Sequence, residues 1–187
     1  MPMRVLGGQL KGRSFGQPDS RSVRPLSDKV RAAIFDIVGD PGGLTVLDAY
    51  AGSGAAGFEA ASRGAALVEA IEFNAAVART IVANARELGL DWGYVLHVLK
   101  LETWLAQPTH QPTATNRPHY GLIIADPPYA NLDIELLERL AGLLGPGGVM
   151  VVSHTSKRLE LPLTGVEQVK QRVYGDTALT FYRRAEA

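Results

Sequence analysis

The sequence predicts an α/β protein with a mostly parallel sheet, helices on both faces and antiparallel strands at one edge. From residue 44 onward, short apolar segments alternate with helical segments, and this alternation is typical of parallel sheets covered by helices. The final extended segments have no helix between them, which predicts an antiparallel pair. Residues 1–40 precede the alternation, so we expect a small basic extension at 1–40 and one domain at 41–187.

The elements of the first half can be placed by their spacing and by their end signals. Two short extended pieces between Arg4 and Phe15 are expected to form either a hairpin or a flexible arm. Ser27 is a suitable N-cap for a helix at 27–38, where apolar residues recur at helical intervals. The following elements are expected to be strands at 44–47, 66–71 and 94–99, helices at 53–62 and 75–88, and a helical turn at 101–106.

The second half begins with a proline-containing interruption. Residues 107–118 have no apolar period and are expected to form a long surface loop. An amphipathic helix is expected to end before the run Gly145-Pro146-Gly147-Gly148. The remaining expected elements are a strand at 120–125, that helix at 132–144, a strand at 149–152, and extended segments at 159–161, 167–174 and 178–182.

Composition narrows the class of protein. The chain has 187 residues, 46% of them hydrophobic, which suits one domain with a sizeable core. It has no cysteine, and its four histidines lack ligand spacing, so neither a disulfide nor a metal site is predicted. No apolar run reaches the roughly 18 residues of a membrane span, and residues 1–20 do not resemble a secretory signal. We therefore expect a cytoplasmic monomer.

Charge is spread unevenly along this neutral chain. Residues 1–36 carry seven basic side chains against three acidic ones, a local balance of +4. A basic segment of this kind fits a polyanionic partner, although a merely solvated N-terminus would have the same composition. The candidate phosphate contacts are Arg4, Lys11, Arg13 and Arg24.

A glycine-rich turn follows the strand expected at 44–47. Its sequence, from Asp48 and Ala49 through Gly52 and Gly54 to Gly57, also fits the G-x-G-x-x-G pattern of dinucleotide-binding folds. However, the carboxylate of Asp48 would repel a pyrophosphate and attract the amino group and sulfonium of S-adenosylmethionine. Gly52 and Gly54 would let the backbone lie close to that cofactor. The turn therefore favours S-adenosylmethionine over NAD.

Glu72 ends the second expected strand of the domain. A carboxylate at this place can accept both hydroxyls of a ribose, and Phe73 beside it could face an adenine ring. As alternatives, Glu72 could cap the next helix and Phe73 could pack in the core.

Asp126-Pro127-Pro128-Tyr129 follows the apolar strand expected at 120–125. Asp126 and the Pro127 carbonyl can accept hydrogen bonds from an exocyclic amino group, while Tyr129 can stack on the base that carries it. Pro127 and Pro128 have fixed φ angles, so the backbone that carries these acceptors is rigid. Ligands of open α/β sheets bind beyond the carboxyl ends of the strands, which is where this motif stands. Together with the glycine-rich turn, residues 126–129 predict a methyltransferase that acts on an amino nitrogen.

The chain resembles the bacterial RsmD-type methyltransferases, which modify the exocyclic N2 of a guanine in 16S ribosomal RNA. The resemblance implies a Rossmann-like, seven-stranded class I methyltransferase sheet with antiparallel last strands. It also implies that Asp48, Gly52 and Gly54 line the cofactor and that Glu72 holds its ribose. The matching runs are R-V-L-G-G at 4–8, R-P-L-S-D-K-V-R at 24–31, the segment 47–57, D-P-P-Y at 126–129 and Y-G-D-T at 174–177.

The resemblance further implies that 126–129 holds the target guanine and that the partner is 16S ribosomal RNA or a small-subunit particle. Lys100 stands where the family commonly has Asp or Asn to meet the adenine amino group, so we expect a backbone contact there instead. Three alternatives remain open: methylation of adenine N6 in nucleic acid, methylation of a glutamine amide in release factors, and a non-enzymatic nucleotide-binding module.

Overall fold

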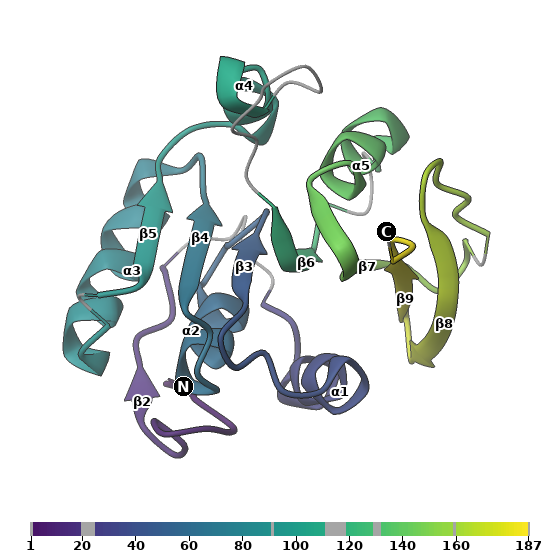
Figure 1. Ribbon diagram of the computed structural model, residues 1–187. Helices are drawn as coiled ribbons and strands as arrows, with labels where there is room; N and C mark the ends of the chain where they lie inside the picture. Colours follow the sequence, from purple (N-terminus) through teal and green to yellow (C-terminus); the bar gives the residue numbers. More distant parts are fainter. Residues whose placement is uncertain are drawn as a thin grey trace. The chain divides into compact units, whose positions relative to one another are not determined.

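The computed structural model describes residues 2–19, 25–90, 92–110, 119–128, 132–158 and 160–186. The chain divides into two compact units, Met1–Leu101 and Glu102–Ala187. In Figure 1 the first unit runs from purple to teal and the second from green to yellow. Each unit carries part of the predicted site and is described in turn.

The sheet strands of the first unit lie in the order β5-β4-β3 and run parallel. In the register, Thr45 faces Leu67 and Val68 faces Tyr94. Because parallel strands end at the same edge, residues that follow β3 and β4 meet there. The bounds are β3 Thr45–Asp48, β4 Leu67–Ile71 and β5 Tyr94–His97.

The helices of the first unit begin and end where the sequence offers caps. In α1, Ser27 accepts a hydrogen bond from the Val30 N–H, and in α3, Asn74 accepts from Val77. Gly89 ends α3 in the left-handed backbone conformation, which residues other than glycine rarely adopt. The bounds are α1 Asp28–Val38, α2 Ala55–Ser62 and α3 Ala75–Leu88; α4, Leu101–Leu105, follows at the junction of the units.

The N-terminal segment is a docked hairpin, which decides between the hairpin and the flexible arm left open by the sequence. Its strands β1 (Met3–Arg4) and β2 (Ser14–Phe15) pair antiparallel. Val5 and Phe15 are buried in one hydrophobic cluster with Phe58, and the Phe15 and Phe58 rings meet edge to face. The hairpin therefore belongs to the core of the first unit.

The strands of the second unit lie in the order β6-β7-β9-β8, with β6 and β7 parallel and the other pairs antiparallel. Together with the three strands of the first unit they confirm the predicted α/β class, with a seven-stranded and mostly parallel sheet. The bounds are β6 Tyr120–Ala125, α5 Ile134–Ala141, β7 Leu144–Thr155, β8 Glu167–Tyr174 and β9 Thr177–Arg183, with a 3₁₀ turn at Pro108–His110.

The C-terminal end predicted for the helix at 132–144 is wrong. α5 ends at Ala141, and Leu144 instead begins β7, where it pairs with Tyr120. The glycine-proline run lies inside β7 as an irregularity in the register. A Cβ at Gly148 would lie 2.8 Å from the Tyr120 carbonyl oxygen, so glycine permits this close approach of the two backbones. The strand expected at 149–152 continues to Thr155, and residues 160–161 of the extended segment expected at 159–161 form no strand. The remaining bounds differ by one to two residues at the ends.

No helix among the described residues is long and apolar enough to cross a membrane. The domain boundary predicted between residues 40 and 41 stays a prediction.

Candidate functional site

The glycine-rich turn of the first unit is built around Asp48. This residue ends β3, is buried, and accepts a hydrogen bond of 2.9 Å at Oδ2 from the Gly57 N–H in the first turn of α2. A Cβ at Gly57 would lie 3.2 Å from that same oxygen and 3.0 Å from the Tyr94 ring. A side chain at position 57 would therefore crowd both Asp48 and Tyr94. The hydrogen bond itself links the end of β3 to the first turn of α2.

The two inner glycines adopt conformations that other residues avoid. Gly52 has φ 52° and Gly54 has φ 78°, both in the left-handed region. A Cβ at Gly54 would also lie 2.9 Å from the Phe58 ring. Ala49, predicted to line the cofactor, is buried directly after Asp48. The two glycines have no side chain to cover the backbone of the turn, and residues 45–57 contain no lysine or arginine.

Glu72 lies directly after β4 and reaches back to this turn. Its Oε2 accepts a hydrogen bond of 3.0 Å from the Gly52 N–H, and its Oε1 accepts one of 2.7 Å from the Asn74 N–H. Burial raises the pKa of Glu72, and these backbone hydrogen bonds act in the opposite direction. Each carboxylate oxygen has a second lone pair, so Glu72 can still accept hydrogen bonds from a ligand diol. Phe73 is 65% exposed, which leaves its ring available to a ligand.

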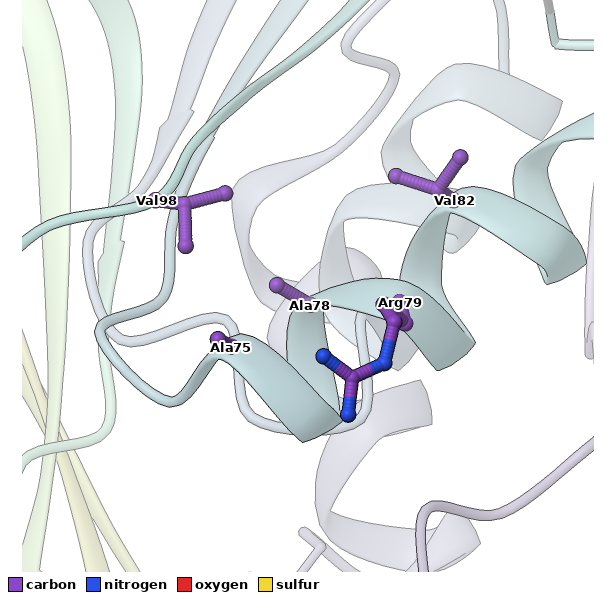
Figure 2. Close-up of a pocket in the computed structure, with 5 residues that line it drawn as sticks. All are labelled: Ala75, Ala78, Arg79, Val82 and Val98. Carbon is purple, nitrogen blue, oxygen red and sulfur yellow. The ribbon is translucent and has the colours of Figure 1, made fainter.

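A hollow of about 340 Å³ lies beside the N-terminal half of α3. Figure 2 shows Val98, which follows β5, and the side chains that α3 contributes. The hollow contains none of the predicted cofactor residues, although its first residue, Ala75, comes three positions after Glu72. Lys100 is exposed. The lining residues are Ala75, Ala78, Arg79, Val82 and Val98.

Asp126 is positioned by the second unit, directly after β6. Its partly buried carboxyl group accepts a hydrogen bond from the side chain of Ser153 on β7. Burial raises the pKa of Asp126 from 3.8 to about 6, and the Ser153 hydrogen bond opposes that increase. Pro127 is buried and Pro128 is exposed. Tyr129 lies outside the described residues.

The four candidate phosphate contacts have different surroundings. Arg13 donates to the carbonyls of Glu87 and Leu88 at the C-terminal end of α3, so its guanidinium holds β2 to that helix. Arg4 and Lys11 are exposed. Arg24 lies outside the part of the chain that the structure describes.

Sequence reasoning missed a buried polar network that attaches the hairpin to the helices. Glu59 on α2 is fully buried and accepts hydrogen bonds from the Leu6 N–H and from Arg63 Nε, both at 2.8 Å. Arg31 on α1, also fully buried, donates to the Arg4 carbonyl at 2.6 Å and lies 4.0 Å from Glu59. The available signal was the position of these charges on the apolar faces of two expected helices.

Comparison with known proteins adds three findings. The model of the family described as Conserved hypothetical protein 95 matches residues 3–183. The Escherichia coli K12 protein named Ribosomal RNA small subunit methyltransferase D is 31% identical over 193 residues, covering 97% of this chain and 90% of its own. A protein of Bacillus subtilis named "Putative rRNA methyltransferase YlbH" is 31% identical over 97% of this chain and 99% of its own.

Solved structures share the fold over most or all of this chain. A structure described as "Putative methyltransferase yhhF from Escherichia coli" superposes with a TM-score of 0.86 at 26% identity, covering 100% of both chains. Thermus thermophilus hypothetical protein TTHA0928 superposes with a TM-score of 0.76 at 31% identity, covering 99% of both chains. A structure described as "SMU.776, a putative methyltransferase complexed with SAH" has the same fold at 16% identity and a TM-score of 0.66, covering 85% of this chain and 50% of its own.

Proposed function

The chain belongs to the Conserved hypothetical protein 95 family, and from that premise we propose that it methylates the exocyclic N2 of a guanine in 16S ribosomal RNA, using S-adenosylmethionine. The observation that carries the proposal is the partly buried Asp126, placed directly after a parallel strand and followed by two prolines. The name of the Escherichia coli relative supports small-subunit ribosomal RNA as the substrate class.

The residues of the first unit fit the proposed cofactor. Buried Asp48 gives the glycine turn a negative charge, and the turn offers no cation to a phosphate. Glu72 keeps acceptor capacity for a ribose, and exposed Phe73 offers a ring to an adenine. These two carboxylates and the ring suit a cationic nucleoside with a free diol better than a dinucleotide. When bound, S-adenosylmethionine supplies an electrophilic methyl group on its sulfonium.

Asp126 would prepare the guanine amino group for reaction. The lone pair of guanine N2 is delocalised into the ring, which makes the nitrogen a poor nucleophile. Hydrogen bonds from the amino group to Asp126 and to the Pro127 carbonyl favour a pyramidal nitrogen with its lone pair exposed. With a pKa of about 6, Asp126 is charged at neutral pH and can take up the proton that N2 loses. Much of the acceleration would come from positioning the reactants.

The remaining contacts concern the RNA. Tyr129 would stack on the target base, which must leave any base stack to reach Asp126. Arg4 and Lys11, with Arg24, would contact phosphates, whereas Arg13 would act through the fold because its guanidinium is bonded to α3. The substrate would be 16S ribosomal RNA or a small-subunit particle, and the protein would act as a cytoplasmic monomer.

The test is to assay methyl transfer on ribosomal RNA, and on small-subunit particles, from a strain that lacks the gene. The modified nucleotide is then identified by mass spectrometry. We expect one methyl group on guanine N2. A product methylated on adenine N6, or on a glutamine amide of a release factor, would replace this proposal by one of the two enzymatic alternatives.

A further inference from the structure

Ser153 is a buried polar residue whose position on β7 places it beside Asp126. Strands β6 and β7 run parallel, and Ala125 faces Val152 in the register. Asp126 and Ser153 each come one residue later, at the same end of these neighbouring strands. Ser153 is 2% exposed, and its side chain is hydrogen bonded to the Asp126 carboxyl group. Sequence reasoning gave Ser153 no role.

The residue opposite Ser153 is apolar, and the next residue on β7 lies on the other face of the strand. The cross-strand partner of Ser153 on β9 is the apolar Leu179. The next residue, His154, belongs to the opposite face of β7, and its ring is 2.8 Å from the Thr180 hydroxyl. Burial raises the pKa of Asp126, and the Ser153 hydrogen bond lowers it.

A carboxylate that must receive an amino group needs a fixed plane and a charged state. A carboxylate has two oxygens and about four acceptor sites, and it rotates about the bond to its Cβ unless a neighbour holds it. A buried hydroxyl that donates to the carboxylate fixes that plane and leaves acceptor sites for a ligand. The hydrogen bond also favours the charged form, since a hydroxyl donates to a carboxylate more strongly than to a neutral acid.

We propose that Ser153 is the positioning residue of this site: its hydroxyl holds the Asp126 carboxylate in the orientation and in the charged form that receive the substrate amino group. The inference rests on the proposed function for the meaning of that orientation, and on the Ser153–Asp126 hydrogen bond for its physical basis. Ser153 itself touches no substrate and acts through Asp126.

The first test needs no substrate. Carbon-13 NMR follows the titration of the Asp126 carboxyl in the wild-type protein and in Ser153→Ala, with Asp126→Asn used to assign the signal. Because Ser153→Ala removes a donor to the charged form, the midpoint should rise by about one pH unit. Ser153→Thr keeps the hydroxyl and should keep the wild-type midpoint. Ser156→Ala is the control, because the recorded hydrogen bond of Ser156 uses its backbone N–H, which donates to the Asp176 carbonyl.

The second test is the pH profile of single-turnover methyl transfer to ribosomal RNA at saturating RNA. In Ser153→Ala the fall in rate on the acid side should begin about one pH unit higher than in the wild type. The rate should recover toward pH 8.5, while the RNA concentration for half-saturation stays unchanged. A role in folding alone would lower the rate equally at every pH.

The outcomes are distinguishable. An unmoved Asp126 midpoint in folded Ser153→Ala overturns the positioning role. If that variant does not fold, Ser153→Cys replaces it, since a thiol is a weaker donor of similar size and must also raise the midpoint. A midpoint that moves in a protein that methylates no RNA supports the link between Ser153 and Asp126 and overturns the proposed function instead.

Discussion

The backbone N–H of Gly52 donates a 3.0 Å hydrogen bond to Oε2 of Glu72, twenty residues further along the chain. This bond ties the glycine-rich turn after β3 to the end of β4, so that two motifs predicted separately belong to one constellation. Glu72 consequently has two functions: it shapes the turn, and it keeps acceptor capacity for a ligand. Replacing Glu72 should disturb both.

We expect Glu72→Ala to weaken binding of S-adenosylmethionine by roughly 1–3 kcal/mol, because ribose hydroxyls would be left without an acceptor. Isothermal titration calorimetry measures the change. Glu69→Gln is the matched control, since Glu69 lies on β4, which Glu72 follows, but its carboxylate contacts His97 Nε2 at 2.7 Å. NAD binding without S-adenosylmethionine binding would reverse the choice of cofactor.

Asp126→Ala should retain the fold and the cofactor affinity but lose about 10²–10³-fold in the rate of methyl transfer. This is the typical cost of removing one preorganised polar group that faces the reacting atom. Single-turnover transfer to ribosomal RNA is the measurement, and circular dichroism checks the fold. A near wild-type rate would exclude Asp126 from the chemistry.

Asp126→Asn should stabilise the protein at neutral pH. The pKa of Asp126 is raised to about 6 in the folded chain, so between about pH 3.8 and 6 the folded state binds more protons than the unfolded state. Stability contributed by this group is therefore complete below pH 3.8 and is lost as the pH rises through 6. Asparagine stays neutral, and the gain at pH 7 should be about 1–3 kcal/mol.

Thermal unfolding of Asp126→Asn and wild type at pH 4 and pH 7 measures the difference. The two melting temperatures should nearly coincide at pH 4 and separate at pH 7, with the variant higher. An equal separation at both values of pH would mean that the carboxyl charge is not its cause.

The sequence allowed prediction of those features that depend on local chemistry. Strand and helix order followed from apolar spacing, and the turn from Asp48 to Gly57 followed from its glycines. The predicted extent of α5 was wrong because Leu144 continues the apolar spacing of the helix. In the structure Leu144 pairs with Tyr120, which is distant in sequence. Pairing across such distances carries no local signal.

The same limit applies to the site. Asp126 was identifiable from the prolines that follow it, whereas Ser153 is one of many polar residues within strands, and its role depends on the β6–β7 register. Arg13 was expected to meet phosphate because it lies in a basic segment, yet its guanidinium caps α3. The composition of a segment gives its charge, but it does not show which groups each charged side chain contacts in the folded protein.

Gly8→Ala should destabilise the first unit by roughly 1–3 kcal/mol beyond the effect of Gly12→Ala. Both glycines have left-handed backbones, with φ 75° and 86°, but a Cβ at Gly8 would lie 2.0 Å from the Ser62 carbonyl oxygen, whereas a Cβ at Gly12 meets nothing within 4 Å. The difference between the variants thus isolates the close contact of hairpin and α2. Equal melting temperatures for the two variants would contradict that contact.

Arg4→Ala and Lys11→Ala should weaken RNA binding and reduce its salt dependence, each by close to one unit in the slope of log K against log salt. Point substitutions are required, because deleting the hairpin would also remove the buried Val5 and Phe15. Arg13→Ala should mainly lower the melting temperature, since its guanidinium bonds to α3. Fluorescence anisotropy with ribosomal RNA fragments over a range of salt gives the slopes. Cofactor affinity, measured on the same variants, should stay unchanged. If both slopes equal that of the wild type, the basic charge of the hairpin is merely solvated and RNA must bind through other residues.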